Sequence, residues 1–212
     1  PSVVRQSRWG RGMQIDFADI VCKSPLLLEA SDHVRRQILG CGRIRQIDRG
    51  ATLFLQGENT CCFYIVLEGW VKLYRISPTG NEAIVGLLTR GGSFGEGTAL
   101  RTEPHAVSAS AASDCTLMRI EAACLRRAVG EEPELALAIL SATLSQMNTL
   151  VDQVERLKVQ SGAQRVAAFL LELCDGVGPA CTVGLPYEKV LIAGYLGMKP
   201  ESLSRAFGRL RE

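Results

Sequence analysis

The feature that most restricts the fold is a long stretch without an internal glycine or proline, from Pro133 to about Val159. Its apolar residues are spaced alternately by three and four positions, a heptad pattern that continues for more than two heptads. The residues of this seam are Leu137, Leu140, Leu144, Met147, Val151 and Val154. The pattern predicts a long helix whose apolar stripe needs a partner surface, which is either the rest of its own chain or the same helix of a second subunit.

A second apolar line on this helix allows both alternatives to hold together. It consists of Ile139, Thr143, Leu150 and Leu157. One face of the helix can cover the preceding domain while the seam pairs with its copy. We therefore expect residues 131–160 to form a dimerisation helix and the protein to be a homodimer.

Upstream of this helix, short β-rich runs alternate with turn signals between Ile44 and Ile120. The runs are ATLFLQ, FYIVLEG, VKLYRI, AIVGLL and CTLMRI, and the turn signals fall at Gly50, Gly57, Gly69, Pro78-Thr79-Gly80, Gly91-Gly92 and Gly95. This rhythm is typical of an antiparallel roll or sandwich rather than of alternating α/β units. Ahead of it, Ser31-Asp32 can cap a short helix that runs to Leu39, and residues 1–18 have no periodicity and predict a loose arm.

The C-terminal segment predicts a helix-turn-helix. Residues 190–196 form a short first helix, Gly197-Met198 a tight turn, and Pro200 opens a second helix, where proline fits the first position. Ser161-Gly162 separates this region from the long helix and is a candidate hinge. The whole chain is thus expected to be α+β: residues 1–18 an arm, 19–130 a β-roll domain, to which the resemblance described below gives an effector-sensing role, 131–160 the dimerisation helix and 161–212 the helix-turn-helix DNA-binding domain.

The second helix of the helix-turn-helix has a face suited to reading bases. Leu203, Phe207 and Leu210 form its apolar side, and the expected DNA-binding residues are Lys199, Glu201, Ser202, Ser204, Arg205 and Arg209. Arg205 can donate two hydrogen bonds to guanine, and Glu201 can accept one from cytosine. Phosphates would repel Glu201, so its presence favours base reading over general attraction. The alternative is an ordinary amphipathic helix whose first-turn glutamate favours the helix dipole.

Composition sets limits on the other function classes. The formal net charge is only +2 at pH 7, so a nucleic-acid surface must be local. No apolar run is long enough to span a membrane and the N-terminal residues do not resemble a signal peptide, so we expect a cytoplasmic protein without a membrane partner. The eight cysteines show no CxxC spacing, and we expect them to be mostly buried free thiols.

Taken in order, these motifs resemble the Crp/Fnr superfamily of the cyclic-AMP receptor protein and the fumarate and nitrate reduction regulator. The resemblance covers almost everything after residue 20. It rests on the long helix, the helix-turn-helix and three phrases of the roll: GATLFLQGE, FYIVLEGWVKLYR and GGSFGEGTAL. It implies a jelly roll like that of cyclic-nucleotide-binding domains, a dimer, a winged-helix DNA-binding domain and RNA polymerase as a partner.

The pattern Glu-x-x-Ser-Arg at Glu201, Ser204 and Arg205 is similar to that of the anaerobic, nitric-oxide-responsive Fnr/Dnr branch. The DNA half-site bound by that branch resembles TTGAT. The resemblance implies that Arg205 and Glu201 read its G·C pair. A two-fold dimer would then read an inverted repeat in double-stranded DNA, with half-sites about 34–36 Å apart.

Three departures limit this resemblance. The family's effector pocket maps to Gly95 and Glu96, but the later positions read His105-Ala106 instead of the arginine that holds a cyclic phosphate, so we do not expect cyclic AMP. A cyclic-nucleotide-responsive regulator stays the alternative. Cys22 stands alone before Cys41, so we do not expect an iron–sulfur cluster. The sequence also reaches Glu212 without the family's wing, which is either missing or outside this chain.

The effector itself is left open, with nitric oxide or redox chemistry as the hypotheses. Some regulators of this branch are thought to sense nitric oxide through haem, for which His105 is a weak candidate ligand. The Cys61-Cys62 pair lies in a predicted turn where a thiol could be redox-active. A cupin-like metal-dependent enzyme on the same roll would need clustered histidines and carboxylates. The chain has only two histidines, far apart, so we do not expect an enzyme.

Overall fold

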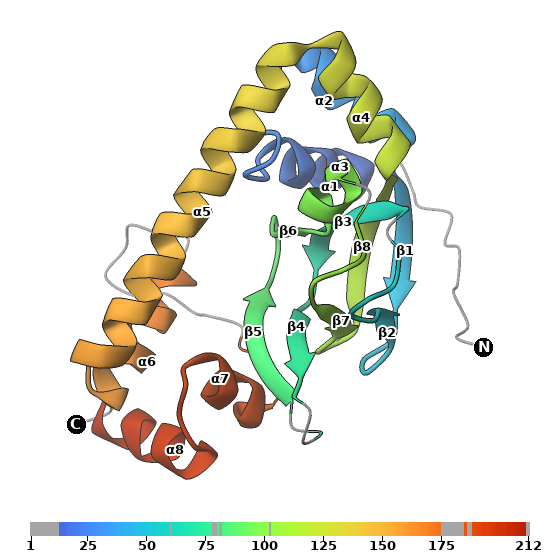
Figure 1. Ribbon diagram of the computed structural model, residues 1–212. Coiled ribbons are helices and arrows are strands. Elements are labelled where there is room, and N and C mark those ends of the chain that lie inside the picture. The colour runs from blue at the N-terminus through green and yellow to red at the C-terminus, as the bar shows by residue number, and fades with distance from the viewer. Residues whose placement is uncertain are drawn as a thin grey trace. The chain divides into compact units, whose positions relative to one another are not determined.

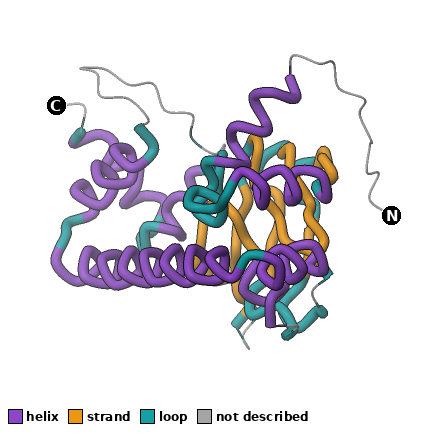
Figure 2. The backbone as a smooth tube through the Cα atoms, turned by 90° about the horizontal axis from the view of Figure 1, so that it is seen from above, coloured by secondary structure: helices purple, strands orange, loops and turns teal. Residues whose placement is uncertain are grey.

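The computed structural model describes residues 13–59, 61–77, 80, 82–101, 103–174, 185 and 188–210. The chain divides into two compact units, Pro1–Ser145 and Gln146–Glu212 (Figure 1). Strands gather in the first unit, with helices beside them, and the described part of the second unit is helical (Figure 2). The expected α+β class, with a β-roll, a long helix and a helix-turn-helix, is confirmed.

Within the described residues, the first unit contains two four-stranded antiparallel sheets. In order across the first sheet, the strands are β1 (Arg43–Ile47), β8 (Cys115–Glu121), β3 (Cys62–Glu68) and β6 (Ser93–Phe94). In the second they are β2 (Thr52–Phe54), β7 (Ser108–Ala111), β4 (Val71–Ile76) and β5 (Glu82–Leu88). Each of the five predicted runs contains a strand, so the prediction of an antiparallel roll is confirmed.

Strand β3 shows how the roll builds two hydrophobic cores. Its side chains alternate between the two faces of the sheet, as the period of a strand requires. Phe63, Ile65 and Leu67 pack with helical residues in one cluster. Cys62, Tyr64 and Val66 pack with residues of the second sheet in the other. Because both faces of the strand are covered, the sequence of β3 is a continuous apolar run up to Leu67.

The predicted turn at Gly69 shows why glycine is needed there. Gly69 has φ +86°, and a Cβ at this position would clash with the carbonyl oxygen of Asp114. A side chain would therefore face both backbone strain and a steric barrier. The turn signals at Gly50, Gly57, Gly80, Gly91 and Gly95 also have positive φ.

In the described part of the first unit, four helices precede the long one. The predicted short helix is α2 (Asp32–Cys41), and Ser31 caps it by accepting a hydrogen bond from the Val34 N–H. Helix α1 (Met13–Cys22) begins within the range that we assigned to the arm, and Phe17 is buried on it. Helices α3 (Glu96–Arg101) and α4 (Ala122–Glu131) were not predicted.

The long helix is α5 (Pro133–Val159), as its heptad pattern predicted. Leu135 and Ile139 join the helical core cluster of the first unit. The second unit then contains α6 (Gly162–Glu172), α7 (Lys189–Tyr195) and α8 (Pro200–Arg209). Among the described helices, none is both long and apolar enough to cross a membrane.

Candidate nucleic-acid interface and sensor region

Helices α7 and α8 form the predicted helix-turn-helix. Gly197 has φ +62°, and the Met198 N–H donates to the Ala193 carbonyl at 2.9 Å. A Cβ on Gly197 would lie 2.8 Å from Leu157 Cδ2, so the turn packs closely against the end of α5. The turn is thus held by its own backbone and by an apolar contact.

The orientation of α8 follows from its apolar residues. Leu203 and Ala206 are buried and Phe207 is half-buried. Leu210, which we expected on the same side, is 44% exposed because α8 ends at Arg209 and the periodicity of the helix ends with it. Lys199 precedes Pro200 as the N-cap and makes no side-chain capping bond.

The outward face of α8 carries the predicted reading residues. Glu201, Ser204, Arg205 and Arg209 are exposed, as is Lys199, whereas Ser202 is half-buried. The Arg205 Nη2 donates to Ser202 Oγ at 3.4 Å, which steadies the guanidinium. Within the described residues, neither Glu201 nor Arg205 takes part in an ion pair. Both groups therefore keep their charge available for an external partner.

A hollow lies between α8 and the start of α6. It has a volume of about 220 Å³, and its lining includes Gly162, Ala163, Ser202, Arg205 and Arg209. Ser161 begins α6 with a capping box, in which its side chain accepts from the Gln164 N–H while Gln164 Oε1 accepts from the Ser161 N–H. The hollow combines two guanidinium groups with the positive end of a helix dipole, an arrangement that favours anions.

The predicted dimer seam on α5 is open along its length. Each of its members is between 48% and 65% exposed in the single chain: Leu137, Leu140, Leu144, Met147, Val151 and Val154. Of the second apolar line, Ile139 is buried, while Leu150 and Leu157 are about half exposed at 50% and 49%. A continuous apolar stripe of this kind marks an interaction surface.

The tentative effector residues lie at the start of α3 and in the loop that follows it. Gly95 has φ +87° and precedes Glu96, whose Oε1 accepts from Ser93 Oγ at 3.1 Å, while Oε2 has no hydrogen-bond partner among the described residues. Burial raises the pKa of Glu96. Thr98 connects the two segments, since its Oγ1 donates to the Gly95 carbonyl and lies 3.4 Å from His105 Nδ1.

His105 is enclosed by the interior of the roll. Its side chain is 6% exposed, and its ring stacks on Phe54 with centroids 3.5 Å apart. Burial lowers the pKa of His105, so the neutral ring is favoured. The neighbouring Ala106 contributes its carbonyl, which accepts from Arg75 Nε at 3.1 Å.

Two contacts describe the surroundings of His105 as a candidate haem ligand. Its Nδ1 lies 3.4 Å from Thr98 Oγ1, and one face of its ring is covered by Phe54. Tyr64 and Phe94 stack on each other with centroids 5.2 Å apart, and both lie beside Phe54. The described residues contain no group of three or more histidine, cysteine or carboxylate side chains that could hold a metal ion.

The cysteines differ from the expectation of mostly buried free thiols. Cys41 and Cys124 form a disulfide, and Cys174 is also disulfide-bonded. Four others are free: Cys22, Cys61, Cys62 and Cys115. The correction has a structural cause, because α2 and α4 pack on the same face of the sheet and bring the Cys41 and Cys124 Cα atoms to 6.5 Å.

The Cys61-Cys62 pair has two different environments. Cys61 is exposed and its Sγ accepts a hydrogen bond from Arg119 Nη2 at 3.7 Å. Cys62 is the first residue of β3 and donates to Tyr64 Oη at 3.3 Å. Burial raises the pKa of the Cys62 thiol, which therefore stays protonated at neutral pH. The sequence did not single out Phe54, Tyr64 or Arg119, because only the pairing of the strands brings them to these groups.

Two family descriptions match the chain. Residues 44–132 match "Cyclic nucleotide-binding domain" and residues 164–212 match "Crp-like helix-turn-helix domain". The nitrogen fixation regulation protein FixK of Bradyrhizobium diazoefficiens is 33% identical over 194 residues, which cover 90% of this chain and 78% of FixK. The global nitrogen regulator of Synechococcus elongatus is 30% identical over 187 residues, which cover 82% of this chain and 83% of that protein.

Solved structures extend the similarity to the fold. A putative cyclic nucleotide binding protein from Ruegeria pomeroyi is 48% identical with a TM-score of 0.77, and the match covers 93% of this chain and 88% of that one. DNR from Pseudomonas aeruginosa is 29% identical with a TM-score of 0.57, over 96% of this chain and 89% of that one. The similarity therefore covers the roll, the long helix and the helix-turn-helix together.

Proposed function

The chain belongs to the Crp/Fnr family of transcription regulators, and from this premise we propose that it is a homodimer that reads an inverted repeat under control of a signal sensed in its β-roll. Its curated relatives are regulators, so the expectation that the chain is not an enzyme is confirmed. We propose RNA polymerase as the partner of the DNA-bound dimer, because the chain belongs to a family of transcription regulators.

The observation that carries the proposal is the outward face of α8. Arg205 is exposed without an ion pair among the described residues, and its fork of donors suits guanine O6 and N7. Glu201 lies one helical turn earlier on the same face and can accept from the N4 of the paired cytosine. One G·C pair of a TTGAT-like half-site thus engages both residues.

The hollow between α8 and the start of α6 supports a second kind of contact with DNA, to its phosphates. Arg209 and Arg205 line it together with the first residues of α6, and a DNA phosphate is the anion that we propose for it. Contacts to phosphate place the protein on the duplex without selecting a sequence. Arg209 is therefore assigned to affinity, whereas Arg205, which lines the hollow and also belongs to the reading face, is assigned to discrimination as well.

A second copy of this chain is the proposed partner of the α5 seam. Six apolar side chains at heptad spacing are each about half exposed or more, and pairing would remove them from water. The two recognition helices of such a dimer would contact half-sites about 34–36 Å apart. That distance is one turn of DNA, and the two-fold symmetry of the dimer is why the operator should be an inverted repeat.

The signal that we propose is nitric oxide or a redox change rather than cyclic AMP. In the roll, Ala106 and His105 occupy the positions where the family's cyclic-nucleotide binders place an arginine for the phosphate, and the stacked rings of Phe54 and His105 fill the adjacent interior. Titration calorimetry with cyclic AMP tests this choice directly, and saturable binding at micromolar concentrations would refute it.

The experiment for DNA reading compares two reading variants with one control variant. Fluorescence anisotropy is measured with a TTGAT inverted repeat and with a duplex in which the G·C pair of each half-site is replaced. Arg205→Ala and Glu201→Ala should each reduce the discrimination between the two duplexes by about 1–3 kcal/mol. Arg209→Ala is the matched control and should weaken binding to both duplexes alike. Unchanged discrimination in both reading variants would overturn the assignment.

A further inference from the structure

A disulfide fastens helix α2 to helix α4. Cys41 is the last residue of α2, and Cys124 lies in the first turn of α4, 83 positions later. Cys124 is 5% exposed, whereas Cys41 is half-buried. A small reagent can therefore approach this bond from the Cys41 side.

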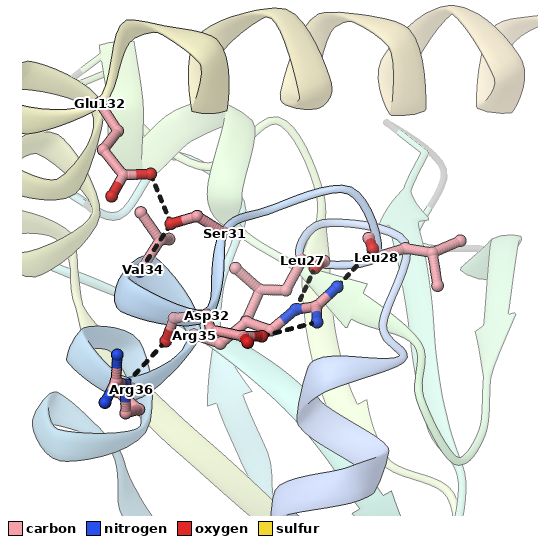
Figure 3. A network of polar contacts seen from close by, with 8 residues as sticks. All are labelled: Leu27, Leu28, Ser31, Asp32, Val34, Arg35, Arg36 and Glu132. Carbon is pink, nitrogen blue, oxygen red and sulfur yellow. Dashed lines mark hydrogen bonds and ion pairs between the residues drawn. The ribbon is translucent and has the colours of Figure 1, made fainter.

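Two hydrogen bonds fasten the same pair of segments at the far end of α4. Gln37 Nε2, on α2, donates to Glu131 Oε2 at 2.5 Å. Ser31 Oγ, the N-cap of α2, donates to Glu132 Oε2 at 2.6 Å (Figure 3). Both bonds are exposed to water and each contributes little alone. The disulfide is the strong connection between α2 and α4.

This connection lies directly before the long helix. Glu131 ends α4, Glu132 is its C-cap, and Pro133 begins α5. The Glu132 carbonyl accepts from the Leu135 N–H at 3.0 Å, and Leu135 is buried in the core beside α1, α2 and α4. A change in the position of α4 relative to α2 therefore reaches the first turns of α5.

We propose that Cys41 and Cys124 are a reversible thiol–disulfide site, and that its oxidation state sets the α4–α5 joint and with it the affinity for the operator. The last step rests on the proposed DNA-binding function. In the oxidised state α4 is held at both ends. In the reduced state the hydrogen bonds of Gln37 and Ser31 and apolar packing still connect it to α2, without the covalent bond.

The chemistry is a two-electron exchange with a small disulfide such as oxidised glutathione. The Cys41 thiolate attacks the small disulfide, whose S–S bond breaks and releases one small thiolate. The Cys124 thiolate then attacks the mixed disulfide at Cys41, closes the protein bond and releases the second. The protein loses two protons and two electrons, and the small disulfide becomes two thiols.

Arg127 marks Cys41 as the reacting sulfur. Its Nη2 lies 3.6 Å from Cys41 Sγ, and a guanidinium at that distance favours the thiolate form. Its side chain is 59% exposed, so the site stays open to a small reagent. Cys124 is buried, and its Sγ lies 4.0 Å from the Gln37 carbonyl oxygen, as suits a resolving thiol.

The test measures operator affinity in buffers of oxidised or reduced glutathione. The wild-type Kd should differ about 5- to 150-fold between the two buffers, the range of ordinary allosteric coupling. Cys41→Ser and Cys124→Ser should bind equally in both. Cys22→Ser, at a free half-buried cysteine, is the matched control, and Cys174→Ser controls for reduction of the disulfide that includes Cys174; both variants should keep the wild-type difference.

Two structural readouts keep this proposal separate from the proposed function. Differential alkylation with mass spectrometry should find Cys41 linked to Cys124 in the oxidised buffer and alkylated in the reduced one. Amide hydrogen exchange over residues 122–140 should be faster in the reduced wild type. Equal exchange and equal affinity in both buffers, or a redox response that survives Cys41→Ser, would overturn the proposal. Failure of every form to bind the operator, with the exchange difference intact, would instead refute the proposed function.

Discussion

Removal of the Cys41–Cys124 disulfide should destabilise the first unit by an amount that follows from the chain it closes. The two residues are 83 positions apart. Closing a loop of that length lowers the entropy of the unfolded chain and stabilises the fold by about 4.5 kcal/mol in the chain-entropy treatment. We therefore expect Cys41→Ala to lower the free energy of unfolding of the first unit by about 3–5 kcal/mol.

The assay is urea unfolding of the whole chain without reductant, followed by tryptophan fluorescence, to which Trp70, buried in the first unit, contributes. Cys22→Ala is the control because Cys22 is free and half-buried in the same unit. Added dithiothreitol should bring the wild type close to Cys41→Ala and leave that variant unchanged. A loss below about 1 kcal/mol would refute the reasoning, because it would mean that the bond is absent or that the unfolded chain is already compact.

Three further perturbations test other parts of the structure. Leu144→Glu should convert the dimer to a monomer in sedimentation velocity and leave the fold intact, since Leu144 is 48% exposed in the single chain, whereas Ser145→Glu, at an exposed heptad position away from the seam, should stay dimeric. Gly69→Ala should lower the free energy of unfolding by about 2–5 kcal/mol, more than the roughly 1–2 kcal/mol of Gly57→Ala, because both have positive φ but only Gly69 also meets a backbone carbonyl. Burial raises the pKa of Glu96, so the native state favours the protonated carboxyl and the stability that this gives is lost as pH rises above the ordinary glutamate range. Urea unfolding from pH 5 to 8 should therefore show a smaller loss of stability with pH in Glu96→Gln than in the wild type, and identical slopes would contradict it.

Sequence periodicity predicted the parts of the fold in which one segment carries its own signal. The heptads of α5 and the spacing of Leu203 and Arg205 on α8 are local, and the structure follows them. Strand β7 (Ser108–Ala111) is different, because serine and alanine are weak strand formers. It is a strand because β2 and β4 pair with it on either side, and Ser108 Oγ accepts from the Gln56 N–H at 2.9 Å.

The candidate sites also fall into those with a local sequence signal and those without one. A face of one helix can be predicted from its sequence, as for Glu201 and Arg205. The contacts of the sensor region and the disulfide can be recognised only from the tertiary structure. Phe54 contacts His105 only across the roll, and Cys41 reaches Cys124 only because α2 and α4 pack on the same sheet face. No spacing in the sequence shows either contact.

The central claim is that a dimer of this chain reads the G·C pair of two TTGAT-like half-sites. The most direct measurement is the Kd of the wild-type protein for the intact inverted repeat and for the duplex with that pair replaced in both half-sites, at one fixed salt concentration. Each replacement should cost about 1–3 kcal/mol, so together they should weaken binding by at least about 30-fold. The account predicts this loss with two chains bound per duplex, and equal affinity for the two duplexes would contradict it.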